Sequence, residues 1–219
     1  SVLGNTLSNL PLGTACVGNA KLALQAAQSN IVIDVKTVQV AGNVTLNGAP
    51  PTRSCMMASP ATVYFHEIER GYDLTVAVPC MDSFAFSGQI YPGTYKVAVV
   101  GNQYSNLPSG SAFVANSNLV LTSNQSNVAL DVKTVMVSGT VTMNGAPPVK
   151  TCTMASPATV MFHEVTKNYD LSVDVPCLDS FAFDGLVYPG TYRVSVLGNQ
   201  YSNLPGRTAY VAYERLEIQ

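Results

Sequence analysis

The feature that constrains this chain most is an internal repeat. The sequence Gly-Asn-x-x-Ser-Asn-Leu-Pro begins at Gly4, Gly101 and Gly198, so successive copies start 97 residues apart. The segment Tyr-Pro-Gly-Thr-Tyr recurs at the same spacing, from Tyr91 and from Tyr188, without insertion or deletion. Repeats this regular must share one fold, because each copy specifies the same core. The sequence therefore predicts a tandem array of domains.

Apolar residues alternate with other residues over short stretches of each repeat. Leu74, Val76 and Val78 occupy every second position, and Leu171 to Val175 does the same in the next copy. This period of two is typical of strands with one buried face, and Asn47-Gly48 is a turn sequence. No long stretch has the apolar period of a helix. We predict an all-β fold of tandem β-sandwich domains.

The apolar positions change parity where one repeat meets the next. Between Asn30 and Leu46 they are odd-numbered as far as Val35 and even-numbered from Val38, and residues 127–143 change in the same way. A shift of one residue moves the buried face of a strand to its other side. The chain should therefore leave one core and enter the next at these points without a linker. The predicted junctions are Lys36-Thr37 and Lys133-Thr134.

These junctions define the expected domains. Residues 1–36 are predicted to be the C-terminal part of a preceding repeat, or donated strands, with a spare strand at Ile31 to Val35. Residues 37–133 form a complete β-sandwich repeat, and residues 134–219 form one that lacks its final strand. Domains joined without a flexible linker cannot swing freely, so the array should be stiff.

Two cysteines recur in each repeat, Cys55 with Cys80 and Cys152 with Cys177. A recurring pair in a chain of secreted character predicts an intradomain disulfide. Zinc is disfavoured, because each repeat has two Cys and one His and no closely spaced Cys pair. Cys16 has no counterpart and is expected to substitute for a core residue or to bond outside this segment.

The sequence offers little that could support catalysis. His66 and His163 are each followed by Glu, and adjacent residues of a strand point to opposite faces. No nucleophile elbow, phosphate-binding loop or dinucleotide-binding loop occurs. We expect no enzymatic activity and no cofactor.

The low content of charged residues limits the kinds of partner that this chain could bind. Charged residues make up 11% of the chain and the formal net charge is −2, whereas a typical domain has about 25% charged residues. The scattered Lys and Arg form no footprint for nucleic acid, and no apolar run is long enough to span a membrane. A surface so poor in charge suggests partial coverage by neighbouring copies.

Two further sets of residues are candidate sites. Tyr104 and Tyr201 lie in the repeated Gly-Asn-Gln-Tyr-Ser-Asn-Leu-Pro loop, where contact between repeats or chains is expected first. Asn43 and Asn124 begin triplets that fit the acceptor pattern for N-glycosylation, although neither triplet recurs in the other copy.

Two motifs carry a family resemblance. The stretch Val40-Ala-Gly-Asn-Val-Thr-Leu-Asn-Gly-Ala-Pro-Pro, followed by the stretch from Phe84 to Val99, resembles the bacterial carboxypeptidase-regulatory-like domain, which is related to collagen-adhesin B-type domains. The second copy matches from Val137 to Pro148 and from Phe181 to Val196. The resemblance implies an Ig-like or transthyretin-like sandwich of about seven strands, common in tandem within large secreted bacterial proteins.

These observations favour a structural role. We expect a repeat protein of a secreted or cell-surface rod or filament, in which disulfide-bonded domains stack on copies of themselves or on adjacent repeats. Strand exchange between subunits is a sharper form of this hypothesis. The alternatives are an adhesin or carbohydrate-binding array that gains avidity by repetition, and an accessory region of a secreted hydrolase.

Overall fold

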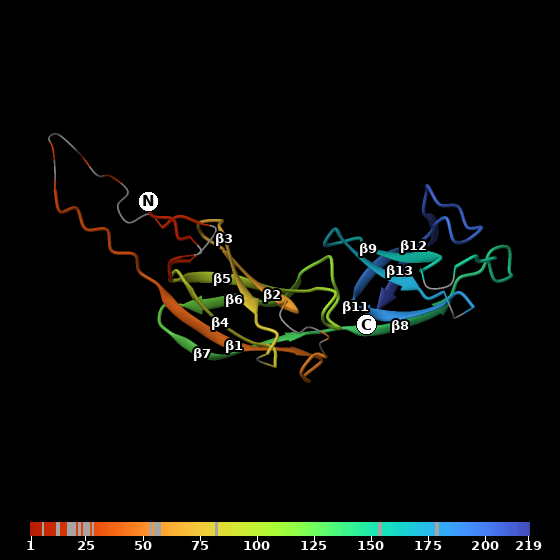
Figure 1. Cartoon of the computed structure of the whole chain (residues 1–219), viewed down its shortest axis with the longest axis horizontal. Helices are drawn as coiled ribbons and strands as arrows, with labels where there is room; N and C mark the ends of the chain where they lie inside the picture. The colour runs from red at the N-terminus through yellow and green to blue at the C-terminus, as the bar shows by residue number, and fades with distance from the viewer. Residues whose placement is uncertain are drawn as a thin grey trace. The chain divides into compact units, whose positions relative to one another are not determined.

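The computed structural model describes most of the 219-residue chain (Figure 1). It leaves out residues 6, 12, 13, 17–20, 22, 24–26, 28, 53, 55–57, 82, 153, 154, 178 and 179. Every helix or strand that it describes is a β-strand. The predicted all-β class is confirmed.

The strands fall into two series that follow the sequence repeat. The first series is β1 (Val38–Leu46), β2 (Ala61–Glu67), β3 (Asp73–Val78), β4 (Ala85–Ile90), β5 (Gly93–Gly101), β6 (Phe113–Leu121) and β7 (Gln125–Val132). The second series is β8 (Val135–Thr140), β9 (Ala158–Glu164), β10 (Tyr169–Val175), β11 (Ala182–Val187), β12 (Gly190–Gly198) and β13 (Tyr210–Ile218).

The chain forms two compact units. Unit 1 comprises residues 1–100 and 114–132, and unit 2 comprises residues 101–113 and 133–219. Unit 1 contains the sheets β4-β1-β7 and β3-β2-β5-β6, and unit 2 contains the sheets β11-β8 and β10-β9-β12-β13. Each unit therefore has the two sheets of a β-sandwich.

The core of unit 1 lies between its two sheets. The side chain of Phe65 on β2 is fully buried and its ring lies 6.4 Å from the ring of Phe86 on β4. The ring of Tyr95 on β5 meets the ring of Phe65 edge to face, with centroids 5.9 Å apart. Phe162 and Tyr192 repeat this contact in unit 2, also at 5.9 Å. The alternating apolar residues of the sequence supply these inward faces.

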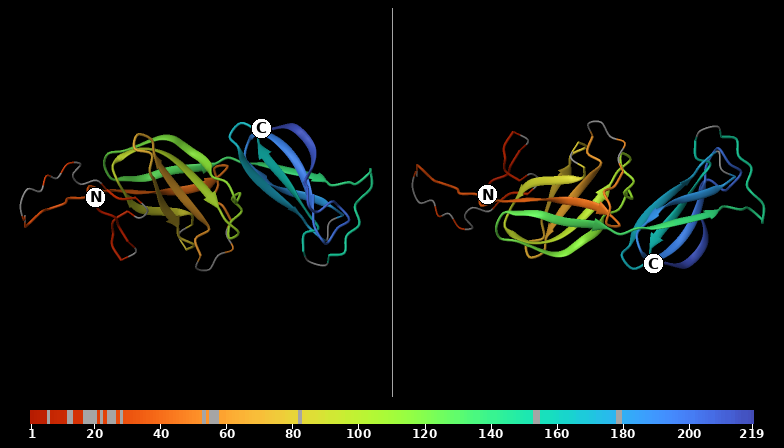
Figure 2. Two further views of the ribbon diagram at one scale, coloured as in Figure 1. Left: turned by 90° about the horizontal axis from the view of Figure 1, so that it is seen from above. Right: turned by 90° about the horizontal axis from the view of Figure 1, so that it is seen from below.

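β1 and β7 form a parallel pair at one side of unit 1. Their register runs from Gly42 opposite Val128 to Leu46 opposite Val132, and the orange β1 and green β7 lie side by side in Figure 2. Leu130 is fully buried and Val132 nearly so. β7 therefore covers the edge of β1 and contributes apolar side chains to the core.

The close approach of β7 requires glycine at position 42. A Cβ atom on Gly42 would lie 1.9 Å from the carbonyl oxygen of Val128 and 2.9 Å from the ring of Phe86. Backbone atoms of a paired strand cannot move aside as a side-chain end can. Gly42 is therefore needed for the parallel pair to form.

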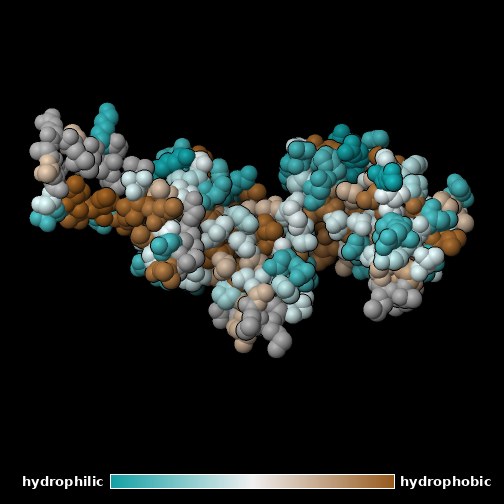
Figure 3. Space-filling model, turned by 45° about the horizontal axis from the view of Figure 1, so that its top comes forward, coloured by the Kyte–Doolittle hydropathy of each residue, from teal (hydrophilic) through white to brown (hydrophobic). Residues whose placement is uncertain are grey.

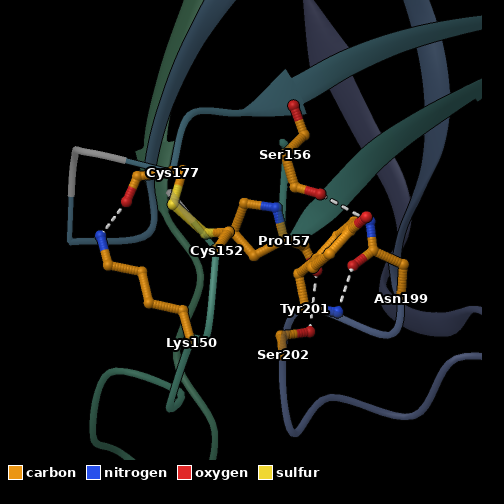
Figure 4. The surroundings of a disulfide bond; sticks show 8 residues. All are labelled: Lys150, Cys152, Ser156, Pro157, Cys177, Asn199, Tyr201 and Ser202. Carbon is orange, nitrogen blue, oxygen red and sulfur yellow. Dashed lines mark hydrogen bonds between the residues drawn. A yellow bond between two sulfur atoms is a disulfide. The ribbon is translucent and has the colours of Figure 1, made fainter. Parts of the chain in front are cut away.

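A disulfide joins Cys152 to Cys177 in unit 2, as the sequence predicted, with Cα atoms 5.9 Å apart (Figure 4). The ammonium group of Lys150 donates a hydrogen bond to the carbonyl oxygen of Cys177. Cys80 is also disulfide-bonded, and its predicted partner Cys55 lies outside the described residues. Closing a loop of this size stabilises a domain by about 3–4 kcal/mol in the chain-entropy model.

The predicted junctions lie between strands. Val132 is the last residue of unit 1 and Lys133 opens the main segment of unit 2, with Lys133-Thr134 between β7 and β8. Lys36-Thr37 precedes β1, and residues 1–36 belong to unit 1. The proposed limits of the repeats remain predictions.

Residues 31–37 form an extended arm outside the sheets. Ile31 is 46% exposed, Val32 87% and Ile33 47%. Figure 3 shows hydrophobic surface along the arm that precedes β1. The sequence predicted a spare strand at Ile31 to Val35, and in this chain that stretch has no strand partner among the described residues. Within the described residues, no helix has the length and apolar character to cross a membrane.

Replacement of Gly42 tests the importance of the β1–β7 pair. We expect Gly42→Ala to destabilise unit 1 by about 1–3 kcal/mol, because the new methyl group overlaps the carbonyl of Val128. Gly139→Ala is the matched control, since a Cβ atom on Gly139 would lie 2.9 Å from the equivalent ring of Phe183 and its three nearest atoms all belong to that ring. Urea unfolding followed by NMR measures both changes, and equal losses would contradict the assignment.

Candidate functional site

The three copies of the Gly-Asn-x-x-Ser loop share one local structure. In each copy the Asn side-chain oxygen accepts a hydrogen bond from the backbone N–H two residues later, at 3.0 Å for Asn5, 2.9 Å for Asn102 and 2.9 Å for Asn199. Asn favours this turn because its short side chain can replace a backbone carbonyl. Tyr104 and Tyr201 supply the N–H groups in the second and third copies.

The third loop packs against the segment that carries the disulfide. The N–H of Thr151 donates to the carbonyl of Tyr201 at 2.9 Å. The hydroxyl of Ser202 donates to the carbonyl of Pro157 at 2.8 Å (Figure 4). Asn199 also donates to the carbonyl of Ser156 at 2.5 Å. This loop is therefore held within unit 2. The role predicted for Tyr104 and Tyr201 in contact between chains remains a prediction.

A cluster of three tyrosines lies near one end of the core in each unit. We call it the tyrosine cluster: Tyr72, Tyr91 and Tyr95 in unit 1, and Tyr169, Tyr188 and Tyr192 in unit 2. Its rings meet edge to face, with centroids 5.9 to 6.3 Å apart. Such contacts hold aromatic rings in fixed positions.

The hydroxyl groups of each cluster form a directed chain. Tyr192 donates to the carbonyl oxygen of Tyr188 at 2.8 Å, so Tyr169 must donate to Tyr192, 2.8 Å away. Burial raises the pKa of Tyr192 and of Tyr188. The hydroxyl of Tyr188 therefore stays protonated and is a hydrogen-bond donor.

Tyr188 donates to a stretch of residues 101–113, the segment that joins β5 to β6 in the sequence. Its hydroxyl lies 2.9 Å from the carbonyl oxygen of Ser111. The hydroxyl of Ser111 in turn donates to the carbonyl oxygen of Asp170 on β10, at 2.8 Å. The ring of Phe113 packs on Tyr188 with centroids 5.1 Å apart. We call this pair of hydrogen bonds the hydroxyl clamp.

Unit 1 contains the same clamp. Tyr91 donates to the carbonyl oxygen of Thr14 at 2.9 Å, and the hydroxyl of Thr14 donates to the carbonyl oxygen of Asp73 at 3.1 Å. Thr14 lies one period before Ser111. Cys16 stands where unit 2 has Phe113 and is a free thiol of intermediate exposure.

A buried glutamate supports each cluster. Glu164 is 2% exposed, and its carboxylate accepts hydrogen bonds from the backbone N–H groups of Thr166, at 2.9 Å, and Lys167. Burial by itself raises the pKa of Glu164, but the N–H groups of Lys167, Thr191 and Thr166 outweigh it and hold the pKa below its ordinary value. The ionised form therefore secures the turn between β9 and β10.

The two His-Glu pairs point to opposite faces, as the strand period requires. Glu67 is buried, whereas His66 lies on the exposed face with Nδ1 2.9 Å from a carboxylate oxygen of Asp73. His163 makes the equivalent contact with Asp170 at 3.0 Å. His and Glu cannot act together on one atom.

The two glycosylation candidates occupy different settings. Asn43 is exposed on β1. The side-chain oxygen of Asn124 accepts a hydrogen bond from the N–H of Gln39 at 2.9 Å. Their modification remains a prediction.

Sequence reasoning missed the hydroxyl clamp. In the sequence, Tyr91 and Tyr188 stand out only as part of the Tyr-Pro-Gly-Thr-Tyr motif. Ser111 and Thr14 differ in type, so identity between the copies does not mark them. The signal available was a hydroxyl side chain at equivalent positions of each copy, including Thr208 in the third.

Neither a protein-family model nor a curated protein matches the chain. Among solved structures, a DUF3823 family protein from Parabacteroides merdae is 15% identical, with a TM-score of 0.33 and coverage of 84% of this chain and 100% of that chain. A proposed adhesin from Bacteroides ovatus is 12% identical, with a TM-score of 0.31 and coverage of 90% and 79%. These scores carry no argument about function, and the resemblance to carboxypeptidase-regulatory-like domains is not confirmed.

Removal of the Tyr188 hydroxyl tests the clamp. We expect Tyr188→Phe to destabilise unit 2 by about 1 kcal/mol and to speed amide hydrogen exchange in residues 108–113, because one hydrogen bond to this stretch is lost. Tyr201→Phe is the control, since its hydroxyl makes no hydrogen bond within the described part of the chain. Equal effects of the two variants would argue against the clamp.

Glu164 should make the stability of unit 2 depend on pH. Its folded pKa lies below the ordinary value of 4.5, so its contribution is complete above that pH and is lost as the pH falls through the folded pKa. We expect Glu164→Gln to cost about 1–3 kcal/mol at pH 7 and less in acid. Urea unfolding at pH 7 and at a pH below the folded pKa of Glu164 measures the free energy lost in the variant. Glu214→Gln, at an exposed position, is the control. A loss independent of pH would refute it.

Proposed function

We propose that the chain is a structural segment of a secreted or cell-surface array of β-sandwich repeats, with a mechanical role as a rod or filament. The observation that carries this proposal is the hydroxyl clamp. Unit 2 takes in residues 101–113, which precede the predicted junction at Lys133-Thr134, and binds them through Tyr188 and Asp170. Residues 101–113 are continuous in the sequence with unit 1 at both of their ends, so the sequence joins the two units on either side of this segment as well as at the junction.

The junction supplies a second covalent connection. Only Lys133 and Thr134 separate β7 from β8, and Thr134 is 8% exposed. A short, largely extended connection of this kind has few conformations to lose. Consecutive repeats are thus tied at two places in the sequence, at residues 101–113 and at residues 133–134.

Composition and cysteine chemistry support an extracellular location. A disulfide such as Cys152–Cys177 persists in oxidising compartments, and it stabilises unit 2. The content of charged residues, 11%, is low for an isolated soluble domain and suits surfaces that neighbouring copies cover. The motifs from Val40 and from Phe84 keep the carboxypeptidase-regulatory-like resemblance as part of this proposal.

The proposal assigns no catalytic role to the chain. The exposed His66 and the half-buried His163 each pair with one Asp on the neighbouring strand, and the adjacent glutamates are buried inside the fold. Strand exchange between copies is a more specific version of this structural role.

The stiffness of the array tests the proposal. NMR relaxation of the full chain should give one rotational correlation time for both units, because two connections couple their motion. Insertion of a six-residue Gly-Ser linker between Val132 and Lys133, combined with Tyr188→Phe, should separate the two correlation times. Independent tumbling of the two units in the unaltered chain would overturn a rigid array.

A further inference from the structure

The edge of β8 in unit 2 is open where the equivalent edge in unit 1 is covered. β1 lies between β4 and β7, whereas β8 pairs only with β11 among the described residues. β1 has nine residues and β8 has six. The positions missing from β8 correspond to Val44, Thr45 and Leu46, which pair with β7 in unit 1.

Apolar side chains near this edge are less covered than their equivalents in unit 1. Val40 is fully buried, but Val137 is only partly buried. Phe86 is 2% exposed, whereas Phe183 is of intermediate exposure. Unpaired backbone groups beside apolar side chains form a ready template for another strand.

The arm that precedes β1 resembles β7 in its apolar pattern and in the backbone angle of one asparagine. Ile31, Ile33 and Val35 lie one period before Val128, Leu130 and Val132. Asn30 has a φ of 63° and Asn127, at the register shift of the β1–β7 pair, has a φ of 69°. A left-handed asparagine in both places shows that the arm already has the bend with which β7 enters its sheet.

We infer that residues 30–35 of one copy add to β8 of a second copy as a parallel strand. This rests on the proposed structural function and names its partner, a second copy of this chain. The β1–β7 register sets the pairing, with Ile31 opposite Gly139, Ile33 opposite Val141 and Val35 opposite Met143. Any shift by one residue would turn the apolar side chains of the arm toward solvent.

A carboxylate clasp fixes this register. In unit 1, one carboxylate oxygen of Asp131 accepts hydrogen bonds from the hydroxyl of Thr45 and from the N–H of Gly48, each at 2.8 Å. The equivalent donors in unit 2 are Thr142 and Gly145, both exposed. Asp34 is the equivalent acceptor.

Asp34 is free to change partner at little cost. Its carboxylate forms an ion pair with Lys36, and both side chains are largely exposed, at 64% and 78%. Exposed ion pairs contribute little to stability. On binding, Asp34 would exchange this contact for the two donors of the second copy.

The inference predicts head-to-tail association, because each copy carries one donor arm and one acceptor edge. Sedimentation velocity of the full chain should show an average mass that rises with concentration. Gly139→Ala should block the acceptor edge by overlap with the arriving carbonyl, and Ile33→Asp should block the donor arm. Each variant alone should stay monomeric, whereas an equimolar mixture should form a one-to-one complex and nothing larger.

The clasp has its own test. Asp34→Asn and Thr142→Val should each weaken association about tenfold, because the first removes the charge of the acceptor and the second removes the hydroxyl donor. Since both changes act on the bond between Asp34 and Thr142, the effect of the double variant should be smaller than the sum of the two single effects. Val32→Thr is the control, because Val32 corresponds to the exposed Ala129 and should leave association unchanged.

Other results would overturn the inference. They are a monomer at all concentrations, failure of the two blocked variants to complement each other, or additive effects of Asp34→Asn and Thr142→Val. None of these outcomes bears on the joint tumbling of the two units, so the proposed array could stand while strand addition fails.

Discussion

The parallel pairing of β7 with β1 determines much of the structure of unit 1. It completes the three-stranded sheet, supplies Leu130 and Val132 to the core, and extends β1 to its full nine residues. In unit 2, β8 pairs with no strand equivalent to β7 among the described residues. There β8 is shorter than β1, and Phe183 is less buried than Phe86. The longer, doubly paired β1 accompanies the deeper burial of Phe86.

The tyrosine clusters show how a polar contact is held rigid at the end of an apolar core. Buried hydroxyls must be satisfied, and the donation from Tyr192 to the carbonyl of Tyr188 leaves Tyr188 facing the clamp segment. Glu164 fixes the adjacent turn through backbone N–H groups. Both contacts recur in unit 1 around Tyr91, so the two units share their polar design as well as their core.

Sequence reasoning gave the all-β class and the Cys152–Cys177 disulfide because both depend on local or repeated signals. Alternation of Leu74, Val76 and Val78 is visible without a structure, and the pair Cys152 and Cys177, 25 residues apart, repeats an equivalent pair 97 residues earlier. The clamp was not predictable in this way. Ser111 meets Tyr188 only after folding brings together residues that are 77 positions apart, and a lone serine carries no distinctive pattern.

Because of the clamp, the limits of a compact unit differ from the limits of a sequence repeat. A compact unit here combines residues 101–113 with residues 133–219, so its limits are staggered against the sequence repeat. An array built in this way would tolerate the loss or gain of one whole period at any cut point, because every tyrosine cluster would still meet a hydroxyl residue 77 positions upstream. The length of such an array can therefore change through recombination between copies while its internal contacts stay the same.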